Sequence, residues 1–159
     1  MPYKVTEDII IENANLLPRP FRNFGGREDK YNREGNRNFC VVIDNPEFAQ
    51  KLIDDGWNIR ILAPRDEDEG PRYYIQVQVS FKNKPPRIVM LTGRNRTALD
   101  EEAVECLDYA EIQNVDLTIS PYNWEVNGKS GVKAYLRNMY VTVREDRLAE
   151  KYAEDNVPF

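Results

Sequence analysis

The chain has 159 residues and a net charge of −5, a length that suits one domain with its own core and needs no disulfide or metal. It has no histidine, so the commonest general base and transition-metal ligand are missing, and we predict that the protein is not an enzyme and has no metal or other cofactor. No run approaches the roughly 18 apolar residues of a membrane span and the N-terminus lacks a secretory-signal layout, so we expect a cytoplasmic protein with no membrane partner.

The first half of the chain predicts strands around one helix. Strands are expected over 9–11, 38–44, 57–63 and 73–81, and the last of these alternates apolar and polar residues, so that one face is core and the other is wet. Asn45 supplies an N-cap, Pro46 a first helical residue and Gly56 a stop signal. This pattern predicts a helix between Pro46 and Gly56.

The second half predicts one strand, one helix and a long hairpin. After a strand over 87–92, capping-box spacing from Thr97 to Asp100 and an apolar stripe predict a helix as far as Ala110, with Cys106 buried on it, as Cys40 is on its strand. Inward alternation over 115–119 and 132–136 flanks a turn expected at 127–131. The apolar phase then slips by one residue, which predicts a β-bulge near Arg137-Asn138.

Bulges bend strands, and small barrels need bent strands. We therefore predict a mainly β fold, a partly open five-stranded barrel with additional strands and two short helices; a β-sandwich is the alternative. The barrel domain is expected over residues 1–144, followed by an acidic C-terminal helix and tail over 145–159.

Basic side chains are concentrated in three stretches, 19–37, 82–96 and 129–144, and the last two contain no acid. The acids collect elsewhere, so the negative net charge describes two different surfaces. Basic stretches of this kind are candidates for contacts with nucleic-acid phosphates. The candidate phosphate-binding residues are Arg19, Arg22, Arg27, Lys30, Arg33, Lys82, Lys84, Arg94, Arg96, Lys129, Lys133 and Arg137.

Aromatic residues accompany these bases on the outward strand faces. Tyr122 and Trp124 lie out of phase with the core set, and Tyr135 lies between Lys133 and Arg137. Rings beside cations suit single strands, because every base has a face that can stack and every nucleotide has a phosphate. Further stacking candidates are Tyr74, on the wet face of its strand, and Phe24 and Tyr31, interleaved with the arginines; for Phe24 an ordinary core role is equally open.

The last five residues, 155–159, put an apolar ring beside a free carboxylate at the end of an acidic stretch. This end resembles the C-terminal tip of bacterial single-stranded-DNA-binding proteins. The resemblance implies that Asp155, Val157, Pro158 and Phe159 bind a protein partner; the alternative is a frayed chain end.

Three segments carry a wider resemblance: Arg37 to Val42, Trp57 to Arg60 and Pro121 to Leu136. They resemble bacteriophage-encoded single-stranded-DNA-binding proteins of the OB-fold class. The resemblance implies an OB-fold-like barrel that binds and protects single-stranded DNA during phage replication, recombination or repair in the host-cell cytoplasm. It also implies that Tyr122, Trp124 and Tyr135 stack on bases and that the tip recruits replication or recombination proteins.

Two other functions stay open at this point. The first is a non-enzymatic virion structural or assembly protein with a β-sandwich fold. The second is a nuclease that holds a metal ion in the acidic loop Asp66 to Glu69, although consecutive acids between prolines are more often solvated charge.

Overall fold

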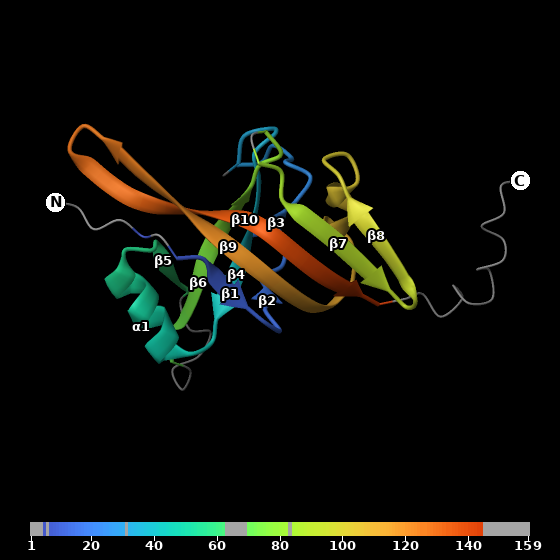
Figure 1. Ribbon diagram of the computed structural model, residues 1–159, viewed down its shortest axis with the longest axis horizontal. Coiled ribbons are helices and arrows are strands. Elements are labelled where there is room, and N and C mark those ends of the chain that lie inside the picture. Colours follow the sequence, from blue (N-terminus) through green and yellow to red (C-terminus); the bar gives the residue numbers. More distant parts are fainter. Residues whose placement is uncertain (1–4, 6, 31, 63–69, 83, 145–159) are drawn as a thin grey trace, which may run out of the picture.

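A computed structural model describes residues 5, 7–30, 32–62, 70–82 and 84–144, which form one mixed sheet with one α-helix and one 3₁₀-helix (Figure 1). Among these residues, no helix is long and apolar enough to cross a membrane. The elements are β1 (Ile9–Ile11), β2 (Asn15–Leu16), β3 (Arg22–Asn23), β4 (Arg37–Ile43), α1 (Pro46–Asp55), β5 (Ile59–Leu62), β6 (Arg72–Val79), β7 (Arg87–Thr92), β8 (Asn95–Leu99), the 3₁₀-helix η1 (Val104–Asp108), β9 (Ile112–Val126) and β10 (Lys129–Val143).

The main path through the sheet runs β1-β9-β10-β6-β4-β2. Its two end strands are neighbours in the chain: Ile9 pairs with Ile119 of β9, and Asn15 pairs with Val42 of β4. Between them, Asn13 adopts a left-handed conformation (φ 55°), and its N–H donates to the Asp116 carboxylate. The first segment therefore joins both edges of the sheet and forms the partly open, mainly β barrel that was predicted, rather than a sandwich.

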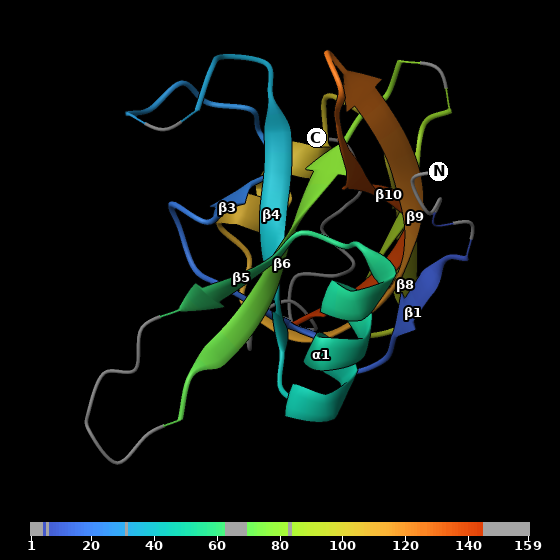
Figure 2. The same ribbon diagram turned by 90° about the vertical axis from the view of Figure 1, so that its left-hand side faces the viewer.

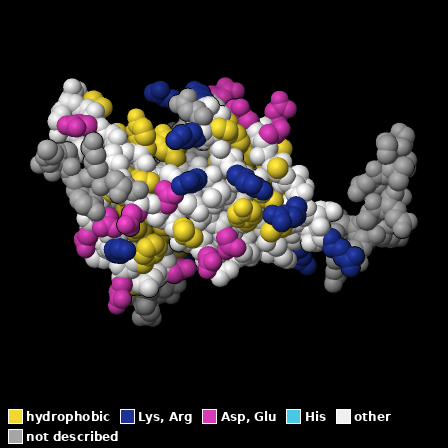
Figure 3. Space-filling view, viewed as in Figure 1, with side chains coloured by type: hydrophobic (Ala, Val, Ile, Leu, Met, Phe, Trp, Pro, Cys, Tyr) yellow, Lys and Arg dark blue, Asp and Glu magenta, His cyan; other side chains and the backbone are white. Residues whose placement is uncertain are grey.

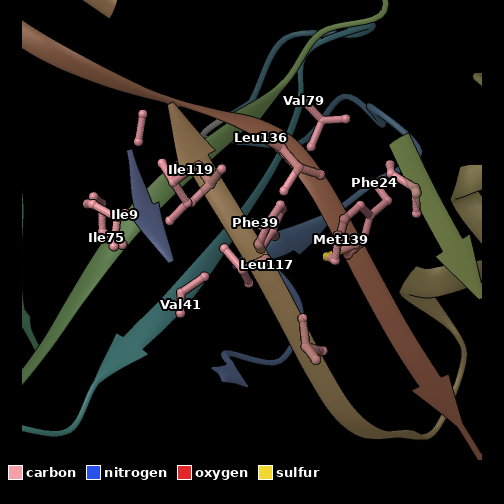
Figure 4. Packing of buried hydrophobic residues seen from close by; sticks show 14 of the residues in the cluster. Ile9, Phe24, Phe39, Val41, Ile75, Val79, Leu117, Ile119, Leu136 and Met139 are labelled. Carbon is pink, nitrogen blue, oxygen red and sulfur yellow. The ribbon is translucent and has the colours of Figure 1, made fainter. Parts of the chain in front are cut away.

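The barrel interior is filled by the inward phase of each strand. Phe24 stacks on Phe39 at 4.8 Å between ring centroids, and both side chains are fully buried. Leu117, Leu136 and Met139 pack into the same cluster from β9 and β10 (Figure 4). Because apolar burial is the main favourable term in folding, these alternating residues fix which face of each strand points inward.

Helix α1 confirms the signals read from the sequence. The Asn45 side chain accepts hydrogen bonds from the N–H groups of Glu47 and Phe48, and Gly56 ends the helix in a left-handed conformation (φ 104°). Ala49 and Leu52 are buried, so the apolar face packs against the barrel, and Figure 2 shows α1 beside β5 and β6.

The helix predicted over 97–110 is wrong in its first part. Residues 95–99 form β8, which pairs with β7 in an antiparallel hairpin. The Asp100 carboxylate accepts from the N–H of Ala103 in the turn that follows β8, and the short η1 then begins after Ala103. Pairing with β7 satisfies the backbone of 95–99, so it outweighs the local helical signals. Cys106 is exposed, contrary to prediction, whereas Cys40 is buried.

The predicted bulge is confirmed, because the β9–β10 register shifts between Leu136 and Asn138. The hairpin turn is tighter than expected: β9 ends at Val126 and β10 begins at Lys129. Only Asn127 (φ 51°) and Gly128 (φ 79°) remain as the loop, both in the left-handed region. Two such residues form the turn that matches the twist of a hairpin, so the turn fixes the register of both strands.

Candidate nucleic-acid interface

The register of the β9–β10 hairpin places its aromatic and basic side chains on one face. Trp124 faces Gly131, Tyr122 faces Lys133, and Ser120 faces Tyr135. These residues are out of phase with the buried Val132, Ala134 and Leu136, as the sequence predicted. The outward face of the hairpin therefore presents three rings, with Lys129 and Lys133 on the same phase of β10.

The Trp124 ring lies directly over Gly131. A Cβ atom at position 131 would be 2.8 Å from Cζ2 of the indole and 2.9 Å from both Cε2 and Nε1. Real Cβ atoms essentially never come so close to other atoms, so the ring occupies the space that any other side chain at 131 would need. Gly131 thus allows the indole to lie across the neighbouring strand.

Tyr122 and Tyr135 form an edge-to-face pair, with 5.8 Å between ring centroids and 76° between ring planes. Tyr122 is 57% exposed, and Tyr135 is partly buried. In such a pair one ring supports the other at its edge, and the face of the more exposed ring remains accessible. Tyr122 is the more accessible of the two for stacking.

A groove of about 490 Å³ lies where β10, β6 and β5 meet. Trp124, Gly131 and Lys133 line it from the hairpin, Gln76 and Gln78 from β6, and Arg60 from the start of β5. Gln78 is the parallel register partner of Tyr135, so the amides of β6 continue the outward face of the hairpin. The groove therefore combines an indole, two cations and two amides that can both donate and accept hydrogen bonds.

Tyr74 continues this outward face along β6, two residues from Gln76. Its ring meets Phe21 edge-to-face at 6.2 Å between centroids. It also packs on a small cluster outside the barrel, formed by Leu17, Cys40 and Val42. Burial raises the pKa of the Cys40 thiol to about 11, so this thiol stays protonated and apolar.

The bases of the first stretch gather elsewhere, at the end of the barrel closed by η1. The Asp108 carboxylate, whose side chain is 0% exposed, accepts hydrogen bonds from the N–H groups of Phe24 (2.7 Å) and Gly25 (2.9 Å). It also lies 3.6 Å from Nη2 of Arg27. One carboxylate from η1 therefore holds the start of the arginine-rich loop.

Two guanidinium groups lie over the ring of Tyr109, the residue after Asp108. The Cζ atoms of Arg19 and Arg27 lie 4.9 Å and 5.3 Å from its ring centroid, and Nη1 of Arg27 donates to its hydroxyl at 2.9 Å. Arg22 lies close enough to Asp108 and Arg19 for both of their charges to shift the pKa of its guanidinium. We call Arg19, Arg22 and Arg27, with Asp108 and Tyr109, the arginine cluster.

Two sequence-predicted residues have a different role in the structure. Phe24 is fully buried against Phe39 in the core and so is not available to stack on a base. Arg137 lies at the bulge, and its Nη1 pairs with the Asp8 carboxylate at 2.6 Å, so its charge is matched by the segment before β1. In both cases contacts distant in sequence decide the outcome, and strand phase alone does not reveal them.

The remaining predicted residues are scattered around the molecule. Arg94 and Arg96 lie on the β7–β8 hairpin, at the opposite end of the molecule from the β9–β10 turn (Figure 1). Lys82 and Lys84 lie in the connection from β6 to β7, and Lys30 and Arg33 lie in the loop between β3 and β4. Tyr31 and the tip residues Asp155, Val157, Pro158 and Phe159 lie outside the described residues, as does the acidic loop at 66–69.

Sequence reasoning missed Arg60, Gln76, Gln78 and Gly131 in the groove, and Asp108 and Tyr109 in the arginine cluster. The polar alternation of β6 was a usable signal for the two glutamines. Nothing in the sequence brings Asp108 to the arginines, because η1 and β3 are more than 80 residues apart.

Figure 3 shows that acidic side chains collect around α1 on the face drawn there.

Comparison with known proteins shows the family and the fold of this chain. A family model described as a putative phage ssDNA-binding domain matches residues 1–159. The single-stranded DNA-binding protein from bacteriophage Enc34, solved in complex with ssDNA, has a TM-score of 0.54 and 12% identity, over 84% of this chain and 85% of that chain. The same phage protein solved without DNA has a TM-score of 0.51 and 13% identity, over 84% and 79%.

A C-terminally truncated form of that phage protein has a TM-score of 0.50 and 16% identity, over 87% of this chain and 86% of that chain. At sequence identities this low, the structural similarity shows the fold alone, which is an OB-fold-like barrel. No curated protein matches the sequence.

Proposed function

This chain belongs to the family described as putative phage ssDNA-binding domains, and we propose that it binds single-stranded DNA in the groove beneath the β9–β10 hairpin. The observation that carries the proposal is the groove itself, where the Trp124 indole, Lys133 and Arg60 surround about 490 Å³ of open space. A ring for a base and cations for a phosphate are the two elements that sequence-tolerant binding of a single strand needs.

The side chains of the groove and of the adjoining hairpin face have distinct roles in this proposal. Trp124 and Tyr122 stack on bases, and each stack is worth about 1 to 3 kcal/mol. Lys129, Lys133 and Arg60 neutralise phosphates, which makes the affinity depend on salt. Gln76 and Gln78 offer amide groups to base edges; in OB-folds, the face of strands 2–3 and the loops between strands 1–2 and 4–5 bind oligonucleotides.

We assign the remaining candidates by their position. Tyr135 supports Tyr122, and Tyr74 extends the binding face beyond the two glutamines. Arg94 and Arg96 stand at the far end of the molecule and take no part in the groove. Lys30, Arg33, Lys82 and Lys84 lie in loops and contribute general attraction for a polyanion.

The biological role follows from such binding. The protein coats and protects transient single strands during phage replication, recombination or repair in the host-cell cytoplasm, and it acts by binding rather than by catalysis. Residues 1–144 form the binding domain. Residues 145–159 form an acidic tail whose tip, Val157-Pro158-Phe159, recruits replication or recombination proteins.

Titration of fluorescent oligo-dT with the full chain at two salt concentrations tests the binding proposal. We expect the affinity to fall as salt rises, with a slope near −0.7 per phosphate contact on a log–log plot. Absence of binding at low salt would instead leave the virion structural role. Cleavage of the oligonucleotide with magnesium would point to the nuclease.

A pull-down of phage and host replication proteins tests the tip separately. Full-length protein and protein lacking Phe159 are compared at equal amounts, after dT binding has shown that both are folded. We expect partners on the full-length protein only. Identical partner lists would assign the tip to the alternative of a frayed end.

A further inference from the structure

The arginine cluster holds more positive charge than its carboxylates balance. Arg22 and Arg27 lie near one fully buried carboxylate, Asp108, and Arg19 covers the ring of the next residue, Tyr109. Glu105, beside Gly25, adds a second acid at the edge. Asp108 is already engaged by two backbone N–H groups and by Arg27. Arg19, which is exposed, forms no ion pair among the described residues.

Among the described residues, some guanidinium N–H donors of the arginine cluster and of nearby Arg37 have no hydrogen-bond acceptor. Within the described part of the chain, the Nε atoms of Arg22, Arg27 and Arg37 are buried without a hydrogen-bond partner. Burial lowers the pKa of Arg22 and the nearby charge of Arg19 lowers it further, while Asp108 opposes both effects. Buried donors without an acceptor are costly, and an anion that reaches them gains charge-assisted hydrogen bonds.

The arginine cluster is also linked to the groove by a row of exposed or half-exposed rings. From Gln76 the outward face of β6 leads to Tyr74, whose ring contacts Phe21. Phe21 is 42% exposed and lies two residues from Arg19, which in turn covers the Tyr109 ring. A strand that leaves the groove along β6 therefore meets rings on which bases can stack and then three guanidinium groups.

We propose that Arg19, Arg22 and Arg27, gathered around Tyr109, form a second subsite that binds a phosphodiester group of the same single strand after it has crossed Tyr74 and Phe21. This subsite rests on the proposed function, because it takes the strand that leaves the groove. Asp108 holds Arg27 and the backbone after Arg22, and Tyr109 positions Arg19 and Arg27 through its ring and hydroxyl. Short oligonucleotides fill the groove alone, and longer ones reach both places.

Strand length separates the two subsites in an experiment. The full chain and the variant Arg19→Gln are titrated with oligo-dT of about 6 and about 16 nucleotides, which span most of the range for one OB-fold. Arg19 is exposed, so its loss leaves the core intact. Arg94→Gln is the matched control, since it removes the same charge from the β7–β8 hairpin, at the opposite end of the molecule from the β9–β10 turn.

We expect Arg19→Gln to weaken binding of the longer strand several-fold and to reduce its salt slope by about 0.7, with no change for the shorter strand. Tyr109→Ala should act in the same direction by releasing Arg19 and Arg27. Equal losses for both lengths, no loss for either, or the same loss in Arg94→Gln would each overturn the second subsite. If the unaltered protein fails to bind even the short strand, the proposal that the groove binds single-stranded DNA is wrong, and so is the second subsite that rests on it.

Discussion

The groove and the arginine cluster both bring rings and cations together, but they are built by different means. In the groove, the tight turn at Asn127-Gly128 sets a strand register, and the register places Trp124 over Gly131 and Tyr122 beside Lys133. In the arginine cluster, the backbone just after β3 is held by one buried carboxylate, Asp108.

This difference shows what a row of bases in a sequence can mean. The arginines of the first stretch look like a free cationic surface, yet Arg27 is engaged by Asp108 and Tyr109. The hairpin has fewer bases, but Lys133 faces an open groove. A row of bases therefore indicates a phosphate site only after its internal counter-charges are subtracted: Arg27 is engaged by Asp108, whereas the exposed Arg19 forms no ion pair among the described residues.

The largest expected effect is on the arginine cluster. Asp108→Ala leaves the N–H groups of Phe24 and Gly25 buried without an acceptor, which costs about 3 kcal/mol in free energy of unfolding. Urea denaturation monitored by circular dichroism measures the loss. As a matched control, Glu111→Ala removes an exposed acid that, among the described residues, pairs with Arg144 alone, and it should change stability by less than about 0.5 kcal/mol. Equal losses in the two variants would mean that Asp108 does not organise the cluster.

The next effect concerns the groove. Trp124→Ala removes a stacking ring and should reduce the affinity for oligo-dT by about 1 to 3 kcal/mol, with little change in stability. In the unaltered protein, indole fluorescence should be quenched on binding; since Trp57 also lines the groove, the part of the quenching that is lost in Trp124→Ala is the part that reports on Trp124. If the variant unfolds while its affinity per folded molecule is unchanged, the ring belongs to the core and not to the groove.

A variant with a smaller expected effect tests whether the register of the β9–β10 hairpin holds Trp124 in the groove. Gly131→Ala inserts a Cβ into the space of the indole, so Trp124 must move, and we expect an affinity loss of about 1 kcal/mol together with a shifted indole emission spectrum. Gly70→Ala is the control, because nothing lies within 4 Å of the Cβ position there. An unchanged spectrum and affinity in Gly131→Ala would show that the ring is not held over this residue.

The smallest effect is electrostatic. Lys133→Gln should flatten the salt dependence by about 0.7 on the log–log plot and should hardly alter base preference. Arg137→Gln should change the slope less, since that side chain is already paired with Asp8. Competition of dT against mixed-sequence oligonucleotides checks base preference. A larger slope change for Arg137 than for Lys133 would reverse the assignment.

The sequence was sufficient wherever the signal was local. The N-cap at Asn45, the stop at Gly56 and the phase slip at Arg137-Asn138 each depend on a few neighbouring residues, and the structure has all three. The outward phase of Tyr122 and Trp124 follows from alternation in the same way.

What the sequence did not reveal depends on contacts between distant segments. Residues 95–99 carry helical signals but pair with β7, and Phe24 finds Phe39 in the core rather than a base. The meeting of Asp108 with the arginines is of the same kind. Such contacts arise from tertiary packing, which outweighs local propensity.

The bridging of both sheet edges by the first segment has a consequence for synthesis. Ile9 pairs with Ile119, so the partner of the first strand emerges from the ribosome roughly 110 residues later. At about 5 to 20 residues per second, that delay is on the order of ten seconds. During this time the apolar side chains of β1 have no sheet to join, and loop closure over such a separation is entropically costly. Barrel closure is therefore a late event in the synthesis of each chain, because it waits for β9.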